Sequence, residues 1–151
     1  MDFFTEIQTI ICIGENIPAS DLHLIRSKTR KREFVLSRQL VMYFLKKVNP
    51  EFTLATIGWY YKKDHATVMH AFKTIDNLIE TDKEFAKKFL DYKLRIDLLV
   101  HFERTLVIDE IAIAKDQLMV LIEKGVPVPV DLIGRYNALL FRSENVSLFS
   151  A

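Results

Sequence analysis

Residues 64–75 read Asp-His-Ala-Thr-Val-Met-His-Ala-Phe-Lys-Thr-Ile, and the rest of the fold can be worked out from this stretch. Its apolar side chains recur every three to four residues, which is typical of an amphipathic α-helix. The predicted buried stripe comprises Val68, Met69, Phe72, Ile75 and either Leu78 or Ile79. Asp64 stands immediately before this stripe, where an aspartate caps the free N–H groups of a helix N-terminus. The stretch therefore predicts a helix that begins after Asp64 and buries one face.

A second short helix is predicted directly upstream. Thr53 is a suitable N-cap for a helix over residues 54–61, and Lys62-Lys63 are expected to form a tight turn. Two short helices joined by such a turn, with polar residues at the start of the second, make a helix-turn-helix pattern. We expect the run Trp59-Tyr60-Tyr61 to pack into the core rather than to stack on single-stranded bases.

Helical periodicity also dominates the N-terminal part of the chain. Helices are expected over residues 3–13, with Gly14 as the C-cap, over residues 20–25, and over residues 33–48. Between the last two, residues 27–32 read Ser-Lys-Thr-Arg-Lys-Arg and lack an apolar anchor. This basic segment is expected to form an exposed loop or a fraying helix start.

The C-terminal third predicts a long helix to Lys124, ended by Gly125, and a last helix capped by Asp131. The long helix carries an apolar stripe at Val107, Ile111, Ala114, Leu118 and Leu121. The last helix carries inward-facing residues at Leu132, Tyr136, Leu139 and Leu140. A hairpin within one chain is favoured over a coiled-coil dimer, and both remain open. The fold class is therefore all-α: a helix-turn-helix bundle with a C-terminal extension of one long and one short helix.

The net charge of +1 conceals a strong asymmetry along the chain. Residues 1–25 carry four acidic residues and neither Lys nor Arg, whereas residues 26–73 hold eleven Lys and Arg against three Asp and Glu. A local excess of +8 suits a phosphate-binding surface, because counterion release scales with the cations that face the backbone. A solvated charged face is the alternative interpretation of any such cluster.

Composition excludes several classes. A chain that is 50% hydrophobic and 27% charged is not disordered, and no apolar run is long enough to span a bilayer. Cys12 is the single cysteine, which excludes a disulfide framework and fits a reducing cytoplasm. The sequence contains no Gly-Lys-Ser or Gly-Lys-Thr and no catalytic constellation, so we expect no nucleotide site, no enzyme activity and no cofactor. His65 and His70 lack neighbouring Cys or Glu ligands, so no metal site is expected.

Several of these motifs together resemble the DNA-binding domain IV of the bacterial replication initiator DnaA, a Trp-repressor-like helix-turn-helix domain, over about residues 7–90. The family pattern is Asp-His-(Thr or Ser)-Thr-Val-(Leu or Met)-His-Ala, followed by a basic residue and Ile. The matching residues are Asp64, His65, Thr67, Val68, Met69, His70, Ala71, Lys73 and Ile75. The basic loop, Arg38-Gln39 with Met42, and Ile57-Gly58 match as well. The resemblance implies a DNA-binding domain over residues 1–90 and a helical extension over residues 91–151, in a stand-alone protein without the ATPase module.

The resemblance further implies double-stranded DNA as the partner, a role in replication or transcription control, and a cytoplasmic, nucleoid-associated protein. The implied base-contacting residues are Asp64, His65 and Ala66 in the major groove, with Arg30 in the adjacent minor groove. The implied phosphate contacts are Lys28, Arg32, Arg38, Lys46, Lys63, Thr67 and Lys73. Base contacts specify sequence, whereas phosphate contacts fix register. His70 is expected to face inward and to be structural.

The sequence departs from the family pattern in three ways, of which the first two favour an alternative. Ala66 stands where Thr or Ser is usual, the turn before Asp64 is a residue shorter and lacks a glycine, and Glu33 adds a negative charge beside the basic loop. The alternative is a helical adaptor or inhibitor that keeps the fold without DNA recognition. In either case residues 94–142 are the expected site of a homodimer or protein-partner contact.

Overall fold

The computed structural model describes residues 3–147, with side chains for residues 4–144. The elements in chain order are α1 (Phe3–Gly14), the 3-10 helix η1 (Ala19–Arg26), α2 (Arg32–Val48), α3 (Leu54–Tyr61), α4 (His65–Thr81), α5 (Lys83–Glu123) and α6 (Val130–Ser147). Every regular element in this described part is helical, so the all-α prediction is confirmed. Residues up to 98 form one compact unit and residues from 99 a second, with the division inside α5.

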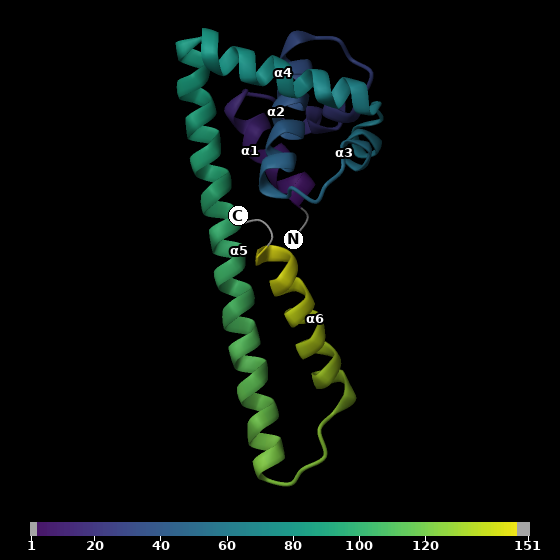
Figure 1. Ribbon diagram of the computed structural model, residues 1–151, viewed down its shortest axis with the longest axis vertical. Coiled ribbons are helices and arrows are strands. Elements are labelled where there is room, and N and C mark those ends of the chain that lie inside the picture. The colour runs from purple at the N-terminus through teal and green to yellow at the C-terminus, as the bar shows by residue number, and fades with distance from the viewer. Residues whose placement is uncertain (1–2, 148–151) are drawn as a thin grey trace. The chain divides into compact units, whose positions relative to one another are not determined.

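Helix α2 is the centre of the first unit, where it packs against α1, η1, α3 and α4 (Figure 1). Its buried residues are Phe34, Ser37, Arg38, Leu40, Val41, Met42, Tyr43, Phe44, Leu45 and Val48. A helix that buries so much of its circumference is typical of a core element. Arg38 is the charged residue in this set, and it donates to the Ser27 carbonyl in the basic loop.

An aromatic cluster ties α2 to α4 and to the first half of α5. The Tyr43 ring meets Phe72 edge-on at 5.9 Å, and Phe44 stacks on Phe89 at 4.8 Å between ring centroids. The Tyr43 hydroxyl donates a hydrogen bond of 2.8 Å to Asp76. Aromatic pairs at these distances stabilise a fold beyond their buried area, so the cluster fixes α4 on the core.

The end of α1 differs from the sequence prediction. Gly14 is the last helical residue, and the left-handed conformation falls instead on Asn16, with φ of 56°. Gly14 is required for another reason: a Cβ there would overlap the Tyr92 ring. Tyr92 donates a 2.7 Å hydrogen bond to Glu15, and Lys88 pairs with the same carboxylate at 2.8 Å. The first half of α5 is thereby anchored to the end of α1.

Two further predictions need correction. The short helix η1 spans Ala19–Arg26 instead of residues 20–25, with Pro18 in the cap position, and the Ser20 hydroxyl donates to Asp21. Met69 was expected in the buried stripe of α4 but is 44% exposed. The buried residues of α4 are Val68, Ala71 and Ile75, because the stripe that faces α2 runs at a spacing of three and four from Val68.

The second unit contains the second half of α5 and α6, which runs back beside it (Figure 1). Gly125, with φ of 64°, ends the long helix as predicted, and its N–H donates to Ile122 at 3.0 Å. Val107, Ala114 and Leu139 are buried, and Arg142 pairs with Glu103 at 2.8 Å. Two details differ from the prediction. Helix α6 begins at Val130, so that Asp131 lies in its first turn, and Leu140 is 36% exposed. Within residues 3–147 no helix is both long and apolar enough to cross a membrane.

Candidate nucleic-acid interface

The turn between α3 and α4 is built by two backbone features. Lys62 adopts the left-handed conformation, with φ of 55°, and the Lys63 N–H donates to the Gly58 carbonyl at 2.8 Å. A Cβ on Gly58 would lie 2.5 Å from the Lys63 carbonyl oxygen, so only glycine permits this close return. The predicted tight turn therefore forms without a glycine of its own, because Gly58 supplies the space and Lys62 the left-handed residue.

The first turn of α4 is capped as predicted. Asp64 Oδ1 accepts a 2.7 Å hydrogen bond from the Thr67 backbone N–H, and Thr53 caps α3 in the same way through Thr56. Hydrogen bonds from the Thr67 side chain and backbone lower the pKa of Asp64. The carboxylate is ionised and open to solvent, so Asp64 combines a capping role with an exposed acceptor at the helix N-terminus.

The exposed face of α4 is wider than the sequence indicated. His65, Ala66, Met69, His70 and Lys73 all lie on it. His70, which was predicted to face inward, is exposed, with its Nδ1 3.2 Å from a neighbouring threonine hydroxyl. At 100° per residue Met69 lies only about 40° from His65 around the helix, so helical spacing alone would have placed it on the exposed face. The prediction was wrong because it followed the apolar character of Met69.

Residues 27–31 of the basic segment form an ordered loop, not a fraying helix start, and Arg32 is the first residue of α2. Ser27 Oγ donates to the Leu24 carbonyl at 2.7 Å and accepts from the Thr29 N–H at 3.1 Å. Thr29 Oγ1 in turn accepts from the Lys31 N–H at 3.4 Å. Short hydroxyl side chains that bond the backbone two residues on stabilise turns of this kind. The loop thus has its own internal support, while its cationic side chains remain exposed.

Arg38 stabilises the start of this loop through hydrogen bonds from the core side. Its side chain is only 6% exposed, and its guanidinium donates to the Ile25 carbonyl at 2.5 Å and to the Ser27 carbonyl at 3.0 Å. Burial lowers the pKa of Arg38. The phosphate contact predicted for Arg38 is therefore corrected to a positioning role. The burial of Arg38 could have been predicted from helical spacing, because Arg38 lies in one stripe with the buried residues Phe34 and Val41.

The loop and the turn bring their positive charges together. The pKa of Lys63 is lowered, first by partial burial and then by the charges of Arg38, Lys28 and Arg30. Such mutual repulsion indicates that the loop lies beside the start of α4. An anionic ligand bound there would relieve this repulsion, which is the electrostatic property of a phosphate site.

Of the remaining predicted phosphate contacts, Lys46 lies apart from the others. Arg32 at the start of α2, Thr67 and Lys73 are exposed. Lys46 lies near the other end of α2, about 21 Å from its start at 1.5 Å per residue. There its ammonium donates to the Pro50 and Phe52 carbonyls, the latter at 2.9 Å. The structure therefore groups Lys28, Arg30 and Lys63 with the first turn of α4 and leaves Lys46 apart.

The aromatic run at the end of α3 is only partly a core element. Tyr61 is fully buried as predicted, whereas Trp59 is 78% exposed, which corrects the prediction for that residue. Tyr60 lies between Phe4, at 4.2 Å between rings, and the guanidinium of Arg26, at 4.3 Å. Arg26 also donates to the Tyr60 carbonyl at 2.9 Å. Sequence reasoning missed this link between η1 and α3, since Arg26 carries no local signal for it.

A short helix, a tight turn, a capped second helix with an exposed first turn, and a basic loop beside it are typical of the helix-turn-helix class of DNA-binding domains. Within that class, residues 4–75 match the profile of the family described as bacterial dnaA protein helix-turn-helix. The resemblance inferred from the motifs is thus confirmed. Among the described side chains no group of three or more His, Cys, Asp or Glu residues could hold a metal ion.

Individual relatives agree with the family match. The chain is 54% identical over 72 residues to the chromosomal replication initiator protein DnaA of Flavobacterium psychrophilum, an alignment that covers 47% of this chain and 15% of that protein. It is 46% identical over 82 residues to the protein of the same name from Wolbachia of Brugia malayi, covering 54% and 17%. The Chlorobaculum tepidum protein is 33% identical over 94 residues, covering 62% and 18%. The chain therefore spans less than a fifth of the length of these relatives.

Proposed function

We propose that this chain binds double-stranded DNA sequence-specifically, in the control of replication or transcription. The first turn of α4 enters the major groove and Arg30 enters the adjacent minor groove. The observation that carries the proposal is the exposed first turn of α4, preceded by Lys63, whose pKa is lowered by burial and by the charges of Arg38, Lys28 and Arg30. The family match of residues 4–75 supports this geometry.

The exposed residues at the start of α4 offer distinct readout chemistry. The Asp64 carboxylate accepts a hydrogen bond from a cytosine amine, and the His65 ring donates to or accepts from a base edge. Ala66 presents a methyl group suited to contact with a thymine methyl, but it lacks the hydroxyl that Thr or Ser would bring. We therefore expect a preferred site that differs from the standard DnaA box where Ala66 reads the sequence.

The cations around this turn supply affinity without sequence choice. Lys28, Arg32, Lys63 and Lys73 are the proposed phosphate contacts. Thr67 joins them if its hydroxyl, which bonds Asp64 in this structure, turns to donate to a phosphate. Each neutralised phosphate releases counterions, so the affinity falls steeply with salt. Arg38 contributes by fixing the loop, because its guanidinium is already satisfied by two carbonyls.

The proposal is tested by selecting bound duplexes from a random pool and measuring the affinity for a selected and a scrambled duplex. We expect tighter binding to the selected duplex, and binding to both at about 50 mM salt. Failure to bind any duplex at that salt concentration would contradict DNA binding. Equal affinity for the two duplexes would contradict sequence specificity.

Single substitutions separate the proposed roles. Arg30→Ala and His65→Ala should each cost about 1–3 kcal/mol on the selected duplex, because base contacts are lost. Lys73→Ala should weaken binding to the selected and the scrambled duplex alike and reduce the salt slope by about 1. Lys124→Ala, at an exposed site beyond α5, is the control with unchanged affinity. A sequence-selective loss for Lys73→Ala would contradict its assignment to phosphate.

A second candidate function, that of a helical adaptor or inhibitor, has one specific observation in its favour. Within residues 94–142, the large apolar residues Phe102, Ile113 and Phe141 are each more than half exposed, and a protein partner could bury such side chains. This function predicts that Arg30→Ala and His65→Ala leave DNA affinity unchanged, while substitutions at Ile113 and Phe141 abolish a protein complex. The same affinity series therefore separates the two functions.

A further inference from the structure

The first half of α5 is apolar on two opposite faces. The inward-facing residues are Phe89, Tyr92 and Ile96. On the outward face Leu90, Leu94 and Leu98 are 64%, 59% and 60% exposed. A surface helix of a folded domain normally turns a polar face to water. Residues four apart form a continuous ridge, so these leucines make one apolar surface that is exposed in the part of the chain the structure describes.

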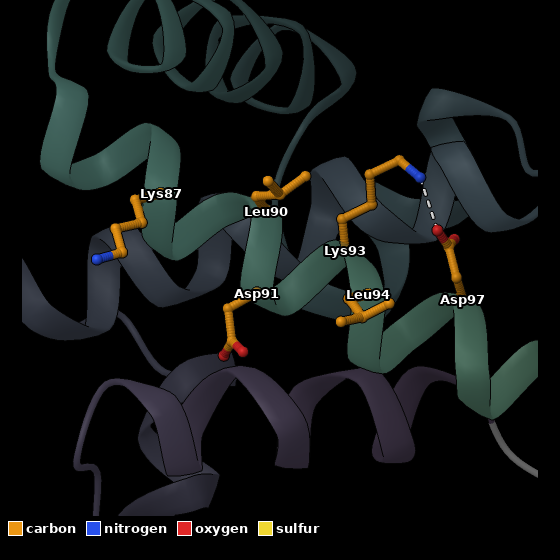
Figure 2. Close-up of a pocket in the computed structure, with 6 residues that line it drawn as sticks. All are labelled: Lys87, Leu90, Asp91, Lys93, Leu94 and Asp97. Carbon is orange, nitrogen blue, oxygen red and sulfur yellow. Dashed lines mark hydrogen bonds and ion pairs between the residues drawn. The ribbon is translucent and has the colours of Figure 1, made fainter.

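The charged residues around this ridge follow a symmetric pattern. Figure 2 shows the six residues that line the shallow apolar hollow here, all on α5. Counting outward from Tyr92, they pair as Asp91 with Lys93, Leu90 with Leu94, and Lys87 with Asp97. Each apolar residue is mirrored by an apolar one, and each charge is mirrored by the opposite charge. When the order of the residues along this face is reversed, each leucine position is again a leucine and each charged position carries the opposite charge.

Helix geometry places this pattern on one surface. Tyr92 points into the core and is only 2% exposed. At 100° per residue, positions two and five residues away from it project within about 40° of the opposite direction, which is toward solvent. A twofold axis through that point sets an identical helix antiparallel to the first. Leu90 then meets Leu94 of the second copy, and Lys87 meets its Asp97.

We propose that a second copy of this chain packs antiparallel across the face formed by residues 87–97, which buries the two central leucines and pairs Lys87 with Asp97 twice. A self-complementary patch is what a twofold homodimer requires, because the same surface serves both subunits. The face carries two acidic and two basic residues, so it has no excess of positive charge to attract a DNA phosphate backbone. The inference goes beyond the proposed DNA binding and does not depend on it.

The size of the face sets the expected strength. Residues 87–97 cover about 15 Å of helix, which is small beside the roughly 1,600 Å² of a standard stable interface. Asp97 also pairs with Lys93 of its own helix at 2.6 Å, so Lys87 of the second copy joins a carboxylate that is already partly neutralised. We therefore expect a weak, concentration-dependent dimer. Binding of two copies to neighbouring sites on one duplex would raise their effective concentration and favour the same contact.

Sedimentation velocity of the full chain over a range of concentrations tests the proposal. We expect a monomer–dimer equilibrium. Lys87→Asp and Asp97→Lys should each weaken self-association about tenfold, because each replaces two attractive contacts per dimer with two repulsive ones. An equimolar mixture of the two variants should recover association, since Asp97 in the first then faces Lys87 in the second and the two introduced residues face each other.

Lys124→Asp makes the same charge change outside the face and should leave the dimer intact. Circular dichroism of each variant verifies the helical fold, and affinity for a duplex with a single site is measured in parallel. The proposal is overturned by a chain that stays monomeric at every concentration, by a dimer insensitive to both variants, or by a mixture that does not recover association. Intact single-site DNA affinity in any of these cases leaves the proposed function standing.

Discussion

Arg38 and Lys28 belong to the same basic third of the sequence, yet their charges serve different purposes. Lys28 is exposed on the loop, where its charge adds to those of Arg30 and Lys63. Arg38 is buried and uses its donors on the Ile25 and Ser27 carbonyls. A planar guanidinium with several donors can satisfy two carbonyls at once, which a lysine ammonium does with less geometric control. Residue identity at position 38 thus controls loop position.

Replacement of Arg38 should act mainly through loss of support for the loop, and only secondarily through loss of one positive charge. Arg38→Ala is expected to lower the free energy of unfolding by about 1–3 kcal/mol, because it leaves buried carbonyls without donors. It should also weaken binding to the selected duplex. Lys28→Ala should weaken DNA binding and leave stability within about 0.5 kcal/mol. Urea denaturation and duplex titration of both variants check this, and equal stability of the two would contradict the positioning role.

The pH dependence of stability should report the cap at Asp64. Hydrogen bonds from Thr67 lower the pKa of this carboxyl in the folded chain. The stabilisation is therefore complete above the ordinary aspartate range and is lost as the pH falls through the lowered value. Asp64→Asn keeps a capping oxygen but does not titrate. The urea midpoint of the parent should thus fall relative to that of Asp64→Asn between about pH 7 and pH 3. Parallel curves would show that the cap does not titrate.

At the scale of elements, the glycines show that the same residue serves different constraints. Gly58 allows the α3–α4 turn to close on the Lys63 carbonyl, and Gly14 makes room for the Tyr92 ring of α5. Gly125 is needed for its positive φ at the end of α5. At Gly134, within α6, an added methyl group would meet no other atom within 4 Å, and φ is not positive. Glycine at this position inside the helix therefore lowers the stability of α6, and no close packing requires it.

Alanine substitutions at Gly58 and Gly134 should change the stability of the fold in opposite directions. Gly58→Ala is expected to destabilise the fold by about 1–3 kcal/mol, because its methyl group meets backbone oxygen in the turn. Gly134→Ala should stabilise α6 by about 0.5–1 kcal/mol, because a helical glycine is replaced without a clash. Thermal unfolding followed by circular dichroism measures both. Stabilisation by Gly58→Ala would mean that the turn is more open than described.

At the scale of the whole molecule, charge and burial are divided along the chain. The cationic surface belongs to residues 26–73, in the unit that also holds the fully buried Cys12. Burial, and then the charge of Glu15, raise the pKa of the Cys12 thiol to about 11. The second unit has its own small core and the Glu103–Arg142 pair. Because it is buried in the first unit, Cys12 is a probe for opening of that unit.

Thiol labelling should follow that opening. At about pH 8 a thiol with this pKa is ionised in roughly one molecule in a thousand, and Cys12 is also inaccessible. A disulfide reagent should therefore label the native chain far more slowly than the chain in urea. An excess of the selected duplex should slow native labelling further, because a ligand that binds only the folded state stabilises it. Fast, complete labelling of the native chain would contradict the described burial.

Much of this molecule follows from local sequence. The caps at Thr53 and Asp64, the turn at Lys62-Lys63 and the helix end at Gly125 all form as predicted, because capping and turn chemistry act over a few residues. Met69, His70 and Trp59 were placed incorrectly. Their exposure depends on which neighbouring helices cover each face, and hydrophobic character alone does not reveal that.

The sequence by itself determined the all-α class, the helix-turn-helix with its family, and the excess of positive charge in residues 26–73, because periodicity, capping and charge are properties of short stretches. Only the tertiary structure decided which cations remain available. It buried Arg38 beneath the loop, engaged Lys46 with carbonyls, and brought Lys28 and Arg30 beside Lys63. It also left the leucines of the 87–97 face uncovered. Whether a charge or a leucine meets water or protein depends on contacts between residues distant in the chain, and packing alone sets those contacts.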